Sequence, residues 1–389
     1  MFKSAKKNEV NYEKCIYKMR LIMKSVYIIS VVLFFFTSCS RHVKNECLFQ
    51  MNHVEDRKIM LSELIDSVEY VPLETVDSSL LPALSKLLYV RDFIYASADM
   101  EIMKFDNKGK FIGKLSEFGN GPQDYLNIND YDIVLRDSEV EIWVCHQKGI
   151  SRYNAEDFSF LGLISLDIPV LHFKYVSDDA IIIQTSGEHS FCLCDKNGVV
   201  RNEFLSNDPA NLSHSLMQFI ETEDGIFCIL ANTDEALYYN KQSEGLELIH
   251  YVGGIDNVLT RDDNRAYMER YGYLVHPQKV AQDFVNIVTF RKKGNCSMFF
   301  LRSGKGEKVL INKNGDDEWE SYDIYPNPTI ENDLLTGLDV RYLLTMSSCD
   351  SDDAFMMSIP AHMLAGALVN GKVIDAEDNP ILIKYQLTN

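Results

Sequence analysis

The sequence predicts an all-β fold of the β-propeller type, and three observations lead to that prediction. A unit of several short strands recurs along the chain at intervals of 41 to 48 residues. Within each unit, two strands are joined by a turn rich in Asp and Asn. Strand-like segments also lie at both ends of the repeated region. Periods of roughly 40 to 50 residues with about four strands each are typical of propeller blades.

The first copy of the unit shows the pattern most clearly. Two β-rich runs, Phe93–Ala96 and Glu101–Phe105, lead into the turn Asp106–Gly109 and a further strand, Lys110–Leu115. A glycine at the end of such a turn supplies the positive φ that tight hairpins need. The segment therefore predicts antiparallel strands joined by hairpins.

Later copies repeat this arrangement less regularly. Equivalent positions, taken where the run before the turn ends, are separated by 48, 41 and 45 residues: Phe105, Tyr153, Cys194 and Tyr239. A fifth, more distant copy and the strands of a last blade follow: Phe284–Phe290, Ser297–Leu301, Glu307–Ile311, Tyr342–Met346 and Phe355–Ile359.

Strands from the two ends of the repeated region are expected to close the ring. Val68–Thr75 and Ile381–Leu387 are both strand-like, and pairing them would leave no open sheet edge at the closure. Two helical insertions interrupt the strands. Thr260–Tyr271 opens with a capping pattern and predicts a short helix, either a surface insertion or a cover over one end of the ring. A second small helix is expected near residues 361–368.

The charge is acidic and unevenly distributed. The 389 residues carry 38 Lys and Arg against 57 Asp and Glu, a net charge of −19, whereas residues 1–38 hold seven basic groups and only two acidic ones. A field of this sign repels phosphate backbones. Nucleic acid is therefore excluded as a partner, and so is an anionic membrane surface bound by charge alone.

The N-terminus has the pattern of an export signal. Met23 and Lys24 precede an uncharged run of eleven residues, Val26–Phe36, which is too short to span a bilayer but suits a signal-peptide core. Translation could also begin at Met19 or Met23. The small residues before Cys39 resemble a bacterial lipobox, which implies that the Cys39 thiol is acylated and that the protein is held to the membrane by lipid. The alternative is an ordinary signal peptide cleaved nearby.

These features divide the chain into a signal peptide (residues 1–38), a flexible lipidated tether (39–58) and the propeller (59–389). The tether has no hydrophobic periodicity. In some Gram-negative lipoproteins, an acidic stretch after the acylated cysteine directs export to the cell surface. The stretch is basic here, which favours the periplasmic face.

Four segments, taken in order, resemble the six-bladed β-propeller lipoproteins, a mostly uncharacterised family of the Gram-negative envelope. They are the opening Ser67–Thr75, the hairpin Phe105–Ile112, the sequence Gly119-Asn-Gly-Pro122, and Glu377–Tyr385 near the C-terminus. The likeness covers nearly all of the chain after the tether. It implies six blades and attachment to the cell envelope.

The sequence contains no recognised catalytic motif. Neither G-x-S-x-G, H-E-x-x-H, a P-loop nor CxxC occurs, and the seven cysteines after Cys39 form no zinc pattern or complete disulfide framework. Gly119–Pro122 is interpreted as a turn between blades rather than a phosphate cradle. No cofactor is indicated. The metal-ligand candidates are weak, since they lack the full calcium-loop pattern: Asn127, Asn129, Asp130 and Asp132.

The leading hypothesis is an envelope lipoprotein whose propeller binds a protein, peptide or glycan through loops at one end of the ring, without catalysis. The alternative is a lactonase-like or lyase-like enzyme with a divalent metal on the propeller axis. A third possibility is a passive subunit of a larger envelope assembly. Because propellers host many functions, the fold alone does not decide among these. The catalytic residues, the ligand and the oligomeric state are not indicated by the sequence.

Overall fold

The chain divides into two compact units, residues 1–46 and 47–389, and the computed structural model describes the second. Described are residues 47–388 except 82–83, 99, 122, 137–138, 209–218, 231–232, 335–337, 342–348 and 351–353. The predicted signal peptide and Cys39 lie outside these residues, as does the predicted strand Tyr342–Met346.

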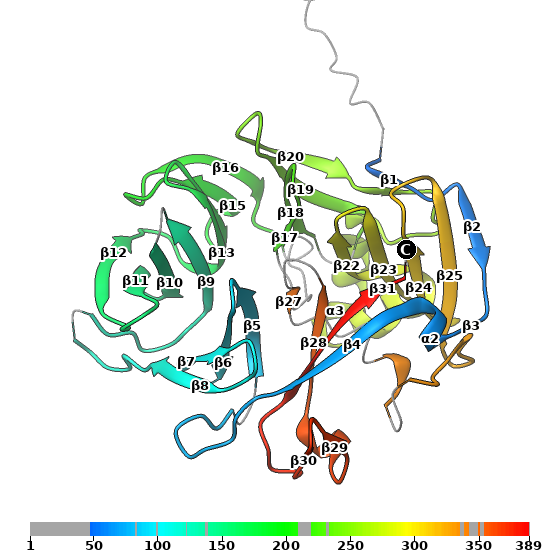
Figure 1. Ribbon diagram of the computed structural model, residues 1–389. Coiled ribbons are helices and arrows are strands. Elements are labelled where there is room, and N and C mark those ends of the chain that lie inside the picture. Colours follow the sequence, from blue (N-terminus) through cyan, green and yellow to red (C-terminus); the bar gives the residue numbers. More distant parts are fainter. Residues whose placement is uncertain are drawn as a thin grey trace, which may run out of the picture. The chain divides into compact units, whose positions relative to one another are not determined.

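The second unit is a six-bladed β-propeller, as the sequence and the resemblance predicted (Figure 1). Blade 1 contains β5 (Leu84–Val90), β6 (Phe93–Ala98), β7 (Glu101–Asp106) and β8 (Phe111–Leu115), and blade 2 contains β9 (Asp130–Arg136), β10 (Glu139–His146), β11 (Gly149–Asn154) and β12 (Phe160–Ser165). Blade 3 contains β13 (Val170–Ser177), β14 (Ala180–Thr185), β15 (His189–Cys194) and β16 (Val200–Ser206), and blade 4 contains β17 (Phe219–Glu221), β18 (Gly225–Ile229), β19 (Glu235–Asn240) and β20 (Gly245–His250).

Blade 5 has β22 (Asn286–Lys293), β23 (Cys296–Ser303), β24 (Gly306–Asn312) and β25 (Glu318–Tyr325). Blade 6 closes the ring with strands from both ends of the unit: β27 (Cys349–Asp350), β28 (Phe355–Ile359), β31 (Ile381–Leu387) and β4 (Ile65–Pro72). The antiparallel register of β31 on β4 runs from Ile381 opposite Pro72 to Leu387 opposite Ile65. The predicted closure is therefore confirmed. The innermost strands β5, β9, β13, β17, β22 and β27 surround the axis.

The turn after the third strand of a blade is held by the side chain that ends that strand. The Asp106 carboxylate accepts hydrogen bonds from the backbone N–H groups of Lys108 and Lys110, both at 2.9 Å. Gly109 follows with φ 82°, and a Cβ there would lie 2.2 Å from the Pro72 carbonyl oxygen of blade 6. Asp195 makes the same turn in blade 3, and Asn154, Asn240 and Asn312 make related turns in blades 2, 4 and 5.

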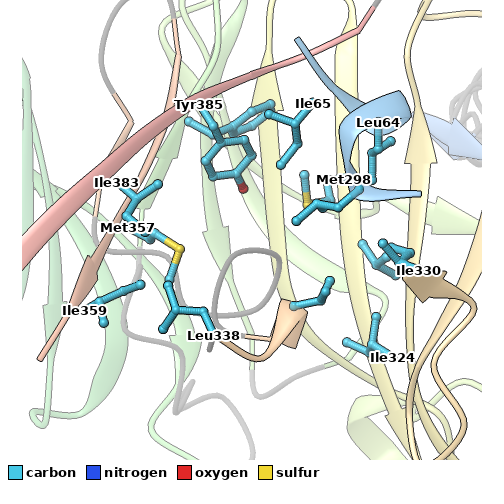
Figure 2. Packing of buried hydrophobic residues seen from close by; sticks show 14 of the residues in the cluster. Leu64, Ile65, Met298, Ile324, Ile330, Leu338, Met357, Ile359, Ile383 and Tyr385 are labelled. Carbon is cyan, nitrogen blue, oxygen red and sulfur yellow. The ribbon is translucent and has the colours of Figure 1, made fainter. Parts of the chain in front are cut away.

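Six clusters of buried apolar side chains in the described part of the chain fill the six junctions between blades. One face of each middle strand packs against the next blade and the other face against the preceding blade. Both faces are therefore buried, which explains nearly continuous apolar strands such as β14 and β28. Figure 2 shows the largest cluster, where Met298 and Ile324 of blade 5 lie near Met357, Ile383 and Tyr385 of blade 6.

The structure corrects the predicted boundary between tether and propeller. Instead of a flexible leash to residue 58, residues 49–60 form three short strands that run along blades 4 to 6: β1 (Phe49–Gln50), β2 (His53–Asp56) and β3 (Ile59–Met60). They pair in parallel with β21 (Val252–Gly253), with β25, and with β26 (Ile330–Glu331). We call residues 47–60 the strap. Its anchors are isolated apolar residues without periodicity, so the sequence pattern did not reveal them.

The helices are few in the described residues. The predicted helix at Thr260 is confirmed and is longer than expected: α3 (Arg261–Asp283) begins where the Thr260 hydroxyl accepts the Asp263 N–H and is kinked at Gly272, whose φ is 70°. Residues Leu61–Leu64 form one turn, α2, and the predicted C-terminal helix is a 3₁₀ turn, η2 (Ala361–Leu364). A small hairpin, β29 (Leu368–Val369) and β30 (Lys372–Val373), follows η2.

Candidate functional site

Charged side chains of opposite sign link the innermost strands of blades 1 to 4. On β9, alternate residues face opposite neighbours: the Tyr131 hydroxyl donates to the Tyr95 carbonyl of blade 1, whereas Asp130 and Asp132 accept N–H groups from β13 of blade 3. This two-residue alternation follows from strand geometry. We call the connected group the axial ladder: Lys86, Asp130, Asp132, His172, Lys174, Glu221 and Lys241.

Asp130 is the centre of the first half of the ladder. The Lys86 ammonium donates to one of its oxygens at 2.7 Å, and the Phe173 N–H donates to the other at 3.2 Å. His172 Nδ1 lies 3.5 Å from that second oxygen. Burial alone would raise the pKa of Asp130, but Lys86 and His172 outweigh it and hold the pKa below its usual value.

Lys174 is the centre of the second half. Its ammonium donates to Asp132 at 3.1 Å and lies 3.5 Å from Glu221, which also pairs with Lys241 at 3.0 Å. Burial would lower the pKa of Lys174, but the two carboxylates raise it above its usual value. Burial would likewise raise the pKa of Glu221, whereas Lys174 and Lys241 lower it. Each of these charges is therefore compensated within the protein.

The structure places the four predicted metal-ligand candidates at the start of β9 but gives them other partners. Asn127 donates to Asn129, whose amide donates to the Val170 carbonyl of blade 3 at 2.8 Å. Asp130 and Asp132 accept hydrogen bonds from ammonium and backbone N–H groups. These donors offer no lone pair, so they cannot complete the coordination of a metal ion. No group of three or more His, Cys, Asp or Glu residues suited to a metal is found in the described residues.

The loop between β8 and β9 leads from the ladder to a second feature, an exposed apolar patch. Tyr125 in this loop is fully buried, and its hydroxyl donates to the Met100 carbonyl at 3.0 Å. Phe118 pairs with Tyr125 through a backbone bridge, and Leu126 follows it. Phe118 exposes 59% of its surface, Leu126 40% and Met100 37%. We call Met100, Phe118 and Leu126 the Tyr125 patch.

Hydrogen bonds fix the loop that carries the patch. Two backbone hydrogen bonds join its ends: the Gly119 N–H donates to the Tyr125 carbonyl at 3.1 Å, and the Tyr125 N–H donates to the Glu117 carbonyl at 3.0 Å. The Asp124 carboxylate accepts the Gly121 N–H at 2.7 Å, and the Lys148 ammonium donates to the Gly121 carbonyl at 2.9 Å. The expected turn between blades at Gly119–Gly121 is confirmed; Pro122 lies outside the described residues.

Other chemically suggestive residues have structural partners. His146 is buried against the Ser151 hydroxyl at 2.7 Å, and burial lowers its pKa to about 4. His250 pairs with Asp234 at 3.0 Å on the surface of blade 4. Burial raises the pKa of Cys192 and Cys194 to about 12 in the core between blades, so these thiols are poor nucleophiles. Cys145 lies in the same cluster.

Sequence reasoning missed both the ladder and the patch. The ladder residues that pair between blades lie more than 40 residues apart in the sequence, so no local motif contains both members of a pair. A search for charged residues at equivalent positions of consecutive innermost strands would have found Lys86, Asp130 and His172. Phe118 could have been noticed as a large aromatic residue in a loop rich in Gly and Asn.

The family model for a domain of unknown function, DUF4934, matches residues 49–386. The chain belongs to this family. The match begins at Phe49, the first residue of β1, so the DUF4934 domain includes the strap. No helix in the described part of the chain is long and apolar enough to cross a membrane.

Two solved structures share the fold. One, a Bacteroides fragilis protein described as exported, superposes with a TM-score of 0.68 at 15% identity, over 87% of this chain and 100% of that one. The other, a DUF4221 member from Bacteroides vulgatus, has a TM-score of 0.50 at 12% identity, over 84% of this chain and 98% of that one. At such low identity the likeness supports the fold alone. None of the curated proteins matches this chain.

Proposed function

We propose that this protein is a binding module of the bacterial cell envelope and that its partner docks on the Tyr125 patch. The single observation that carries the proposal is the exposure of Phe118 on a loop whose backbone is fixed by hydrogen bonds. A large apolar side chain held in place in this way loses little conformational freedom on binding, and aromatic anchors dominate binding energy at interfaces.

The axial ladder supports binding rather than catalysis. Catalytic groups need unsatisfied capacity to take up or deliver a proton or to hold an ion. Asp130 is instead bonded to Lys86 of blade 1 and to the Phe173 N–H of blade 3, and Asp132 is bonded to Lys174 of blade 3. Bonds that connect three blades are suited to keeping the ring rigid. The metal-dependent lactonase-like or lyase-like alternative therefore gains no support from these side chains.

A protein or peptide fits the patch better than a glycan. Met100 and Leu126 are also partly exposed, and burying such aliphatic surface is favourable by about 25 cal/mol per Å². Sugars need several hydrogen-bonding groups beside the aromatic platform. Here Asp124 and Lys148 are already bonded to the loop itself.

Acylation of Cys39 is the second part of the proposal and places the module at the membrane. It is supported by the apolar run before Cys39 and the small residues that separate the two. The Bacteroides fragilis protein of the same fold is described as exported, which agrees with export of this chain. The basic residues after Cys39 favour the periplasmic face.

Photocrosslinking in cells tests the binding proposal. A photoreactive amino acid is placed at position 118 or, as a control, at position 161 on the outer strand β12, where Leu161 has 42% exposure. We expect one discrete crosslinked protein from position 118 that is absent from position 161 and is lost when Met100 and Leu126 are both changed to Asp. Equal labelling from both positions would contradict the proposal. A crosslinked glycan would show that the partner is a glycan and not a protein or peptide.

A further inference from the structure

The strap is held firmly between blades 4 and 5 from Phe49 onward. The Phe49 ring lies 4.9 Å from the ring of Phe290 and 5.4 Å from that of Phe299, measured between centroids. Trp319 donates its indole N–H to the Gln50 carbonyl at 3.2 Å. The N–H groups of Phe49 and Met51 donate to carbonyls of the chain around β21, both at 2.9 Å, and Met51 is buried.

This attachment shortens the connection between the proposed lipid and the propeller. From Cys39 to Phe49 the chain can span at most about 36 Å when fully extended. The predicted tether, which ran to residue 58, would have reached about 70 Å. The docked strap therefore cuts the reach by half and fixes the point on the ring from which the chain leaves.

That point lies at one edge of the ring. β1 pairs with β21, which follows the outer strand β20 of blade 4, and β2 covers the outer strand β25 of blade 5. In a ring of six blades, the junction of blades 4 and 5 is opposite the junction of blades 1 and 2. The Tyr125 loop, which connects β8 to β9, is at that opposite junction.

The edge at blades 4 and 5 has a surface that suits a lipid headgroup layer. It exposes aliphatic side chains, Leu48, Val54 and Leu248. Two of its acidic groups, both on β2, are paired: Glu55 lies 2.9 Å from Arg57 and Asp56 lies 3.1 Å from Lys308. Paired charges reduce the repulsion that the acidic protein would otherwise meet at a membrane surface.

From the short reach and the position of the strap, we infer that the ring stands with its blade 4 and 5 edge toward the membrane and with the Tyr125 patch away from it. This inference rests on the proposed acylation of Cys39. It assigns the strap a second role besides covering β25: it orients the molecule, so that the patch meets partners on the side remote from the lipid.

Energy transfer to a labelled membrane tests the orientation. The full-length lipidated protein is placed in vesicles that contain an acceptor-labelled phospholipid, with a donor attached through an azide-bearing amino acid at position 54 or 161. These positions are matched, because Val54 has 43% and Leu161 42% exposure and both are on outermost strands of opposite blades. We expect higher transfer from position 54 than from position 161. Inserting about 30 Gly and Ser residues between residues 43 and 44 should abolish the difference.

The outcomes separate the orientation from the anchoring. Equal transfer from the two positions in membrane-bound protein would overturn the orientation while leaving the acylation intact. The variant Cys39→Ser should lose membrane association altogether; if it stays bound, or if the native chain does not bind, the anchoring itself is wrong. A higher signal from position 161 would reverse the assigned edge.

Discussion

Two junctions between blades are held together by different chemistry. Between blades 2 and 3, the innermost strands are joined by the carboxylates Asp130 and Asp132, which accept backbone N–H groups and pair with lysines. Between blades 4 and 5, aromatic rings fill the junction, and Phe49 of the strap is one of them. The first junction adds ionised groups to its apolar cluster, whereas aromatic burial dominates the second.

The difference shows how a propeller can close its ring with unequal repeats. In blade 4 the described part of the innermost strand is β17, from Phe219 to Glu221. Aromatic packing and the added strap supply the cohesion there. Blades 1 to 3 have long innermost strands, on which charged groups can meet at regular spacing. Mutations at the two junctions should therefore respond differently to pH.

The largest expected effect is at the aromatic junction. Phe299→Ala removes a fully buried ring stacked on Phe290 at 4.6 Å, and should lower the free energy of unfolding by about 3–5 kcal/mol. Denaturant unfolding followed by fluorescence measures this loss. The matched control is Phe118→Ala, which removes the same side chain from an exposed site. Similar losses for the two variants would contradict the assignment of the junction to apolar burial.

A smaller loss is expected at the ionic junction. Asp130→Asn keeps the shape of the side chain but removes its charge and leaves one acceptor oxygen for two donors, Lys86 and the Phe173 N–H, which should cost about 1–3 kcal/mol. Asp256→Asn, at an exposed site, serves as the control and should be near neutral. If both variants unfold alike, the ladder does not stabilise the ring.

The pH dependence of that loss follows from the pKa of Asp130, which is held below the ordinary value. A carboxyl whose folded pKa is depressed stabilises the protein fully above its unfolded pKa, about 3.9, and loses that contribution as the pH falls through the folded pKa. The gap between the native protein and Asp130→Asn should thus be constant near neutral pH and close in acid. Unfolding curves recorded from pH 7 to 3 check this, and a gap that widens in acid would oppose it.

The smallest effect on stability is expected at the Tyr125 patch. Phe118→Ala should change the free energy of unfolding by less than about 0.5 kcal/mol, because the side chain is exposed and its loop is held by backbone bonds. Thermal unfolding provides the measurement. A loss near that of Phe299→Ala would mean that the patch is part of the core and not a binding surface.

The repeats and the closure could be predicted because they depend on local patterns. Alternating strands and the Asp106 and Asp195 turns are visible in the sequence, and pairing of β31 with β4 follows from the need to seal the sheet. The strap could not be predicted in the same way. Phe49 and Met51 stabilise it through a socket whose rings lie about 180 to 270 residues further along the chain, and its parallel pairing carries no turn signal.

The candidate site was less accessible to sequence reasoning than the fold. Asp130 and Asp132 were noted as carboxylates, but their partners Lys86 and Lys174 belong to other blades and appear only when the ring is assembled. A cluster of acidic and amide side chains in one loop suggested a metal. The lysines and N–H groups that face it are donors, and they give the same residues a structural role.

The most direct test of the account is the affinity for the protein captured at position 118, measured for Phe118→Ala and for Leu161→Ala. If the Tyr125 patch is the binding surface, Phe118→Ala should weaken binding by about 2 kcal/mol, roughly 30-fold, while Leu161→Ala changes it by less than about 0.5 kcal/mol. Equal affinities for the two variants would contradict the claim that this propeller binds its partner through the loop between blades 1 and 2.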